Sequence, residues 1–287
     1  MEKKRYPIIS KEYIAKDIVS MYIKADDIAS EAAPGQFISI YSDDKSLLLP
    51  RPISICDVDR DAGTLRIVFR IVGKGTKEFA EKEAGDTLAM IGPLGNGYIK
   101  ALGEESKDIF GNGESILILG GGIGIPPMLL LAKTLAEGRA CEQPSTCESM
   151  DSIGHVFAEN NTAIVLGYRD ELFMNRDFKD YGNVYISTED GSAGTHGNVI
   201  DCVRENDIKA DVIFACGPLP MLKGIKAYAE EKGIQAWISL EEKMACGIGA
   251  CLACVCETTE VDSHSMVKNK RICKDGPVFD AKEVDLS

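Results

Sequence analysis

"SILILGGGIGIPP", residues 115–127, joins an unbroken apolar run to four glycines and two prolines. An apolar run bounded by turn residues is typical of a strand buried on both faces, as in parallel sheets. Glycine lets backbone N–H groups approach a diphosphate, and a following helix N-terminus adds partial positive charge. The glycines are Gly120, Gly121, Gly122 and Gly124. Their spacing is not the strict G-x-G-x-x-G pattern, so the stretch alone is also compatible with a plain tight turn.

The sequence after this stretch favours the nucleotide site. Apolar strands alternate with helical segments, which predicts an α/β nucleotide-binding domain with a parallel sheet over residues 112–239. A polar excursion of unassigned role, residues 137–161, interrupts it. "CGP", Cys216, Gly217 and Pro218, ends a later strand, at the sheet edge where ligands collect. Cys216 by itself is more typical of a small buried thiol.

The sequence before this stretch has a different pattern of apolar and turn-forming residues. Short β-like runs separated by Gly, Asp and Pro predict an antiparallel β-barrel over residues 1–100. Within it, "RPISI" puts Arg51 and Ser54 on one strand, and "RIVGKGT" puts Gly75 and Thr76 at a possible helix start. An arginine paired with backbone N–H donors suits a flavin diphosphate. Either fragment alone is more typical of an ordinary strand with a surface arginine.

Composition excludes several classes of function. The 287 residues carry a formal net charge of −13, with Lys and Arg scattered, which argues against nucleic-acid binding. The N-terminus has no apolar core or cleavage site of a signal peptide, and the glycines and prolines of 115–127 break the most apolar window. We therefore expect a cytoplasmic protein that does not enter a membrane.

Ten cysteines in such a chain are more typical of buried thiols, metal ligands or redox groups than of disulfides. The last segment, residues 240–287, contains a C-x(4)-C-x(2)-C-x(18)-C pattern. Its members are Cys246, Cys251, Cys254 and Cys273. The spacing of the first three cysteines matches that of plant-type [2Fe–2S] proteins, in which a distant fourth thiolate completes the site. Structural zinc is the alternative, although zinc sites usually pair two short C-x(2)-C-like motifs. Cys256 falls outside the pattern.

The order of these motifs resembles the ferredoxin reductase superfamily. Within it, "SLEEKMACGIGACLACVC" followed by "RICKDGPVF" is similar to the electron transfer subunits of NAD-dependent dihydroorotate dehydrogenase B. The resemblance implies a [2Fe–2S] cluster on the four patterned cysteines and NADH at the glycine turn and the "CGP" edge. It also implies FAD contacts at Arg51, Pro52, Ile53, Ser54, Ile71, Val72, Gly75 and Thr76.

The resemblance further implies a partner, the FMN-containing catalytic subunit of dihydroorotate dehydrogenase, in a heterotetramer with two copies of each chain. The expected function is electron transfer from NADH through FAD and the cluster to that FMN, in pyrimidine biosynthesis, with no side chain acting as general base. Subunits of NADH-dependent ferredoxin:NADP oxidoreductase or of sulfite reductase remain alternatives. A zinc-stapled nucleotide-binding regulator is the alternative from another class.

Overall fold

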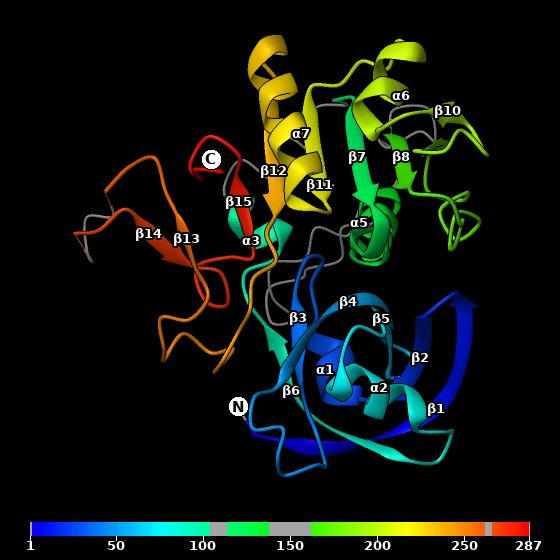
Figure 1. Cartoon of the computed structure of the whole chain (residues 1–287), viewed down its shortest axis with the longest axis vertical. Helices are drawn as coiled ribbons and strands as arrows, with labels where there is room; N and C mark the ends of the chain where they lie inside the picture. Colours follow the sequence, from blue (N-terminus) through cyan, green and yellow to red (C-terminus); the bar gives the residue numbers. More distant parts are fainter. Residues whose placement is uncertain (1, 104–113, 138–161, 262–265, 287) are drawn as a thin grey trace.

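The computed structural model describes residues 2–103, 114–137, 162–261 and 266–286 of the chain. Figure 1 shows a β-barrel at one end, a sheet flanked by helices at the other, and a smaller cysteine-bearing segment beside their junction. The predicted excursion 137–161 lies outside the described residues except for Glu137, as do Cys141 and Cys147. No helix in the described part of the chain is both long and apolar enough to cross a membrane.

Residues 4–94 form a closed antiparallel barrel in the order β1-β2-β5-β4-β3-β6. Alternating side chains point inward along its strands, and isoleucine and other β-branched residues dominate its interior. The strands are β1 Lys4–Ala15, β2 Ile18–Lys24, β3 Phe37–Tyr41, β4 Arg51–Asp59, β5 Thr64–Arg70 and β6 Thr87–Leu94. The helices of this part are α1 Asp26–Glu31, α2 Lys74–Glu81 and α3 Tyr98–Leu102.

The second sheet has the order β10-β9-β8-β7-β11-β12-β15, and all neighbours are parallel except β12 and β15. Its central strands β7 and β11 are buried throughout, which explains their continuous apolar sequence. The strands are β7 Ile116–Gly121, β8 Thr162–Tyr168, β9 Asn183–Thr188, β10 Thr195–His196, β11 Val212–Cys216, β12 Gln235–Ser239 and β15 Val278–Asp280. The helices are η1 Gly122–Gly124, α5 Ile125–Ala136, α6 Val199–Glu205 and α7 Leu219–Lys232.

The C-terminal segment begins with the cysteine loop, which we define as residues 244–254, and continues into a two-stranded hairpin of β13 Val255–Glu257 and β14 Asn269–Arg271. It then returns to the nucleotide sheet, where β15 pairs antiparallel with β12. The cysteine loop is therefore held between two segments that are both anchored to the sheet.

The predicted fold class is confirmed: an antiparallel barrel, an α/β parallel-sheet domain and a small cysteine-bearing C-terminal segment. Contacts between side chains join the first two. Lys133 Nζ on α5 lies 3.2 Å from Asp57 Oδ1 on β4, and Arg66 Nη1 on β5 lies 2.6 Å from Asp177 Oδ2. Tyr98 Oη donates a 3.0 Å hydrogen bond to the carbonyl of Ala215 on β11. These contacts fix the barrel against the edge of the sheet where ligands are expected.

Candidate functional site

The glycine turn, residues 120–124, lies directly between β7 and α5. A Cβ atom on Gly124 would lie 2.4 Å from the carbonyl oxygen of Cys216, and one on Gly121 would lie 2.3 Å from Met221 Sδ. Gly122 has φ of +52°, a backbone conformation that glycine adopts most easily. Gly121 and Gly124 are therefore required for close packing against α7 and β11, whether or not a ligand also approaches the turn. Pro126 and Pro127 occupy the first turn of α5, where a missing N–H is tolerated.

The structure brings the "CGP" edge beside this turn. Cys216 is in register with Gly120, so both end at the same edge of the sheet. The Cys216 side chain is fully buried, and burial raises the pKa of its thiol. Its sulfur is thus an inert packing group, and contact with a ligand at this edge falls to the backbone and to the more exposed Gly217 and Pro218.

The predicted flavin residues gather at one end of the barrel. Arg51, Pro52, Ile53 and Ser54 form the half-buried beginning of β4. The Arg51 guanidinium lies over the first turn of α2, since a Cβ atom on Gly75 would be 3.0 Å from Arg51 Nε. A cation and the free N–H groups of a helix N-terminus thus adjoin, which is the arrangement that a diphosphate requires.

Thr76 and Val72 have different roles in this part of the structure. The Thr76 hydroxyl accepts hydrogen bonds from the N–H groups of Val72 and Gly73 at 3.0 and 3.2 Å, so it holds the turn before α2. The N–H of Ile71 donates a 2.8 Å hydrogen bond to the backbone carbonyl of Asp17, which fixes Ile71 to the barrel. The Val72 side chain is 78% exposed, and nearby in sequence to Arg51 the side chain of Leu48 is 83% exposed. Exposed apolar side chains beside the candidate diphosphate site are suited to cover the ring system of a flavin.

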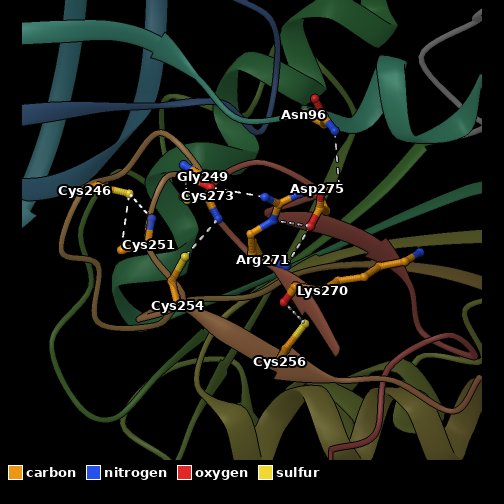
Figure 2. Close-up of polar contacts among 10 residues, drawn as sticks. All are labelled: Asn96, Cys246, Gly249, Cys251, Cys254, Cys256, Lys270, Arg271, Cys273 and Asp275. Atoms are coloured by element: carbon orange, nitrogen blue, oxygen red, sulfur yellow. Dashed lines mark hydrogen bonds and ion pairs between the residues drawn. The ribbon is translucent and has the colours of Figure 1, made fainter. Parts of the chain in front are cut away.

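The four patterned cysteines come together as two pairs (Figure 2). Cys246 Sγ and Cys251 Sγ lie 3.3 Å apart on the cysteine loop. Cys273, on the turn after β14, accepts the Gly249 N–H at 3.1 Å, and its own N–H points to Cys254 Sγ at 3.5 Å. Among the described residues, no three His, Cys, Asp or Glu side chains are arranged around one point as a single metal ion would require. Two irons with two thiolates each fit the pairs better than one zinc ion does.

Backbone N–H groups point at the thiols of this loop. The N–H of Cys251 lies 3.3 Å from Cys246 Sγ. Burial opposes ionisation of Cys246, but donation from Ile248 and Cys251 outweighs it and lowers the pKa of the thiol to about 6. Gly247 and Gly249 have φ of +69° and +80°, which turns the intervening peptides toward the sulfur atoms. The donor set and its surroundings therefore fit an iron–sulfur cluster, whose thiolates and sulfides accept such bonds.

The cysteine loop packs against the barrel next to the predicted flavin strand. A Cβ atom on Gly247 would lie 2.7 Å from Ser39 Oγ on β3, and Ser39 is paired with Pro52 on β4. The Ser39 side chain is fully buried, and its hydroxyl has no hydrogen-bond partner among the described residues. The "RPIS" strand and the cluster cysteines are thus neighbours across β3, although almost 200 positions separate them in sequence.

The remaining cysteines behave as the sequence predicts where the structure describes them. Cys56 and Cys202 are buried thiols like Cys216. In Figure 2 the Cys256 side chain points away from the four patterned cysteines, and its thiol donates to the carbonyl of Lys270 at 3.5 Å. Burial raises the pKa of Cys256 to about 11. Cys256 therefore belongs to the hairpin and not to the candidate cluster site.

Several residues of these sites escaped the sequence-based prediction. Arg271 and Asp275 form an ion pair that contacts the cysteine loop, and Asn96 joins that pair to the barrel. Glu189 at the end of β9 lies 3.8 Å from Arg169 after β8, at the edge where a nucleotide ribose would lie. Neither ion pair belongs to a known sequence motif. Only the stretch "RICKDG" could have indicated the first pair, because it places a cation and a carboxylate on either side of the last patterned cysteine.

Comparison with known proteins gives a consistent result over the whole chain. A family model described as the iron–sulfur cluster binding domain of dihydroorotate dehydrogenase B matches residues 241–285. The electron transfer subunit of NAD(+)-dependent dihydroorotate dehydrogenase B from Shouchella clausii is 36% identical over 291 residues, with 100% of both chains covered. That of Fusobacterium nucleatum is 38% identical over 281 residues, covering 95% of each chain.

Solved structures agree on the fold. A chain of the NADH-dependent reduced ferredoxin-NADP oxidoreductase, studied for flavin-based electron bifurcation, superposes with a TM-score of 0.76 at 30% identity and covers 98% of this chain and 90% of its own. Flavohemoglobin from Malassezia yamatoensis, with bound FAD and heme, reaches a TM-score of 0.61 at 22% identity over 82% of this chain and 58% of its own. The latter similarity shows the fold alone.

Proposed function

The chain belongs to the electron transfer subunits of NAD-dependent dihydroorotate dehydrogenase B, and we propose that its four patterned cysteines hold a [2Fe–2S] cluster. In this proposal the cluster receives electrons from NADH by way of FAD and delivers them to the FMN of a catalytic subunit. A flavin supplies the conversion between the two electrons of a hydride and the single electrons that an iron–sulfur centre carries. The partner is the catalytic subunit, in an assembly with two copies of each chain.

The observation that carries this proposal is the contact between the cysteine loop and the barrel. Gly247 packs on Ser39 of β3, the strand paired with the Arg51–Ser54 beginning of β4. A flavin held by Arg51 and the N-terminus of α2 would thus lie one strand away from the cluster cysteines. Such proximity supports direct transfer between the two groups.

Each part of the chain has a defined task in this proposal. The N–H groups of the glycine turn bind the diphosphate of NADH, and the "CGP" edge supports its nicotinamide end. Arg51 and the first turn of α2 bind the diphosphate of FAD. Backbone N–H groups of the cysteine loop orient and stabilise the thiolates. Asp170 and Glu171 follow β8, and Glu189 follows β9. Together they outnumber the neighbouring cation Arg169, and this excess of negative charge favours NADH over a cofactor with a 2′-phosphate.

An anaerobic titration of the purified chain with NADH tests the proposal, with iron, sulfide, zinc and flavin assayed on the same sample. We expect flavin and iron–sulfur absorbance to bleach together, and added catalytic subunit to link NADH to orotate. A colourless chain that contained zinc and did not respond to NADH would contradict the proposal and support the nucleotide-binding regulator instead.

A second electron acceptor has a specific observation in its favour, the match to NADH-dependent reduced ferredoxin-NADP oxidoreductase over 98% of the chain. The same reduced sample distinguishes the two systems. Reduction of NADP that depends on added reduced ferredoxin, with no electron transfer to the dihydroorotate dehydrogenase catalytic subunit, would favour this second function.

A further inference from the structure

The backbone N–H and the backbone carbonyl of Gly249, in the cysteine loop, are both hydrogen-bonded to the turn formed by residues 271–276. Its N–H donates to Cys273 Sγ at 3.1 Å, and its carbonyl accepts a hydrogen bond from Arg271 Nη1 at 3.1 Å. A Cβ atom on Gly249 would lie 2.5 Å from Lys274 Cδ, so Gly249 also packs against the Lys274 side chain. The contact joins the part of the chain that carries Cys246 and Cys251 to the turn that carries Cys273.

Arg271 is itself fixed by Asp275 (Figure 2). Its Nε lies 3.1 Å from Asp275 Oδ2 and its Nη2 lies 3.2 Å from Asp275 Oδ1, while the Arg271 N–H also donates to Oδ2 at 2.8 Å. The two side chains are 31% and 30% exposed, so solvent screens the pair in part. A bidentate geometry leaves the guanidinium with one orientation, the one that reaches Gly249.

The pair is also anchored to the barrel. Asn96, which follows β6, donates from Nδ2 to the Asp275 carbonyl at 3.2 Å and from its N–H to the Gly276 carbonyl at 2.6 Å. The turn that carries Cys273 therefore has a fixed position relative to the barrel. The guanidinium bonds the carbonyl of Gly249, and the N–H of the same residue donates to Cys273 Sγ, so the positive charge of Arg271 lies beside that cysteine.

We infer that Arg271, held by Asp275, is a positioning residue for the iron–sulfur site: it fixes the separation between the two cysteine pairs and adds a positive charge beside them. This inference rests on the proposed function, since it takes the four cysteines to hold a cluster. A cation near the cluster favours its reduced form, which carries one more negative charge. Loss of the guanidinium would leave the Asp275 carboxylate uncompensated beside the thiolates.

Arg271→Gln, Arg271→Lys and the control Lys270→Gln test this role. Lys270 is the preceding residue on β14 and also a cation, but its Nζ pairs with Glu283 at 2.8 Å and its side chain points away from the cysteines in Figure 2. Three quantities are measured on each purified holoprotein: the rate of iron release to a ferrous chelator, the reduction potential from a titration followed by electron paramagnetic resonance, and the flavin content as a check on folding.

Arg271→Gln should release iron about tenfold faster or more and should have a lower reduction potential. Arg271→Lys should keep the potential close to that of the wild type because it keeps the charge. It should still release iron faster, since a single ammonium group cannot bridge the Gly249 carbonyl and both Asp275 oxygens. Lys270→Gln should match the wild type in both quantities.

Wild-type iron release in both Arg271 variants would overturn the inference, as would an equal effect of Lys270→Gln. If Arg271→Gln binds flavin but takes up no cluster, faster release from Arg271→Lys still supports the positioning role and wild-type release still refutes it. A wild-type chain without iron and sulfide would defeat the proposed function and this inference together, whereas a wild-type cluster indifferent to Arg271 would defeat the inference alone.

Discussion

The glycine turn and the cysteine loop are both glycine-containing loops to which we assign the binding of an anionic group, but they are stabilised in different ways. The glycine turn ends the fully buried strand β7 and packs against the end of β11, which is also fully buried; its glycines contact the backbone of Cys216 and the side chain of Met221. The cysteine loop is largely irregular, and hydrogen bonds to thiols and the Arg271 contact hold it.

The two sites therefore owe their fixed conformations to different interactions. The turn is formed by burial of the parallel sheet, which proceeds without a ligand. The loop is buried in the core at its ends, Met244 and Cys254, whereas Ile248 and Leu252 between them are 53% and 72% exposed. Metal ligation therefore has to supply much of its stability, as in other small metal-binding segments.

The largest expected effect comes from removing one cluster ligand. Cys251→Ser should lose nearly all iron and sulfide and the transfer of electrons to the catalytic subunit, because the Cys246–Cys251 pair is broken. Reduction of the flavin by NADH, followed with ferricyanide as acceptor, should persist. Cys256→Ser is the matched control and should keep its cluster. A full complement of iron and sulfide in Cys251→Ser would show that the ligand assignment is wrong.

Removal of iron from the intact chain compares the two loops directly. Anaerobic chelation should raise the hydrogen exchange of amides in 246–256 toward that of an unprotected chain, because the thiolates lose the metal that joins them. Amides of β7 and β11 should keep their protection, since their hydrogen bonds belong to the sheet. Equal loss of protection in both regions, measured by mass spectrometry, would contradict the distinction drawn between the loops.

A methyl group on the glycine turn should have a smaller but global effect. Gly124→Ala places a Cβ atom 2.4 Å from the Cys216 carbonyl oxygen, and overpacking of this kind costs ~1–3 kcal/mol of stability. It should also raise the KM for NADH. The single tryptophan, Trp237 on β12, reports unfolding of this sheet by its fluorescence.

Gly224→Ala is the matched control for the turn. Gly224 lies inside α7, and a Cβ atom there would meet nothing within 4 Å. This variant should gain up to ~1 kcal/mol of stability from the higher helix propensity of alanine. A loss of stability in Gly124→Ala no greater than in the control would mean that the turn can move to accommodate a side chain.

The smallest expected effect lies outside both loops, in the barrel. Lys82 and Arg5 hold the pKa of Asp43 below its usual value. A depressed folded-state pKa stabilises the fold at neutral pH, and that stability is lost as the pH falls below ~4 and through the folded-state pKa. Because Asp43 is 41% exposed, Asp43→Asn should lose ~1 kcal/mol or less at pH 7. Denaturation at pH 7 and near pH 3 should show the difference from wild type disappear; a constant difference would point to another cause.

The local motifs could be read from the sequence because their residues are close together in the chain. The apolar run before Gly120, the glycines after it and the C-x(4)-C-x(2)-C spacing specify a strand, a turn and a metal loop from short-range geometry alone. The barrel assignment rested on short β-like runs separated by turn residues, and the α/β assignment rested on apolar strands alternating with helical segments; both were confirmed. The assignment of individual FAD and NADH contacts stays a prediction.

Other features depended on contacts between distant parts of the chain. The sequence did not indicate that β15 would join the nucleotide sheet, that Gly247 would pack on Ser39, or that Asn96 would anchor the turn carrying Cys273. Such pairs are separated by tens of positions to slightly more than 200. By itself the sequence determined which groups are available and which local turns they form; the packing of the barrel, sheet and cysteine loop decided which groups meet, because burial of apolar faces sets those positions and no local spacing records them.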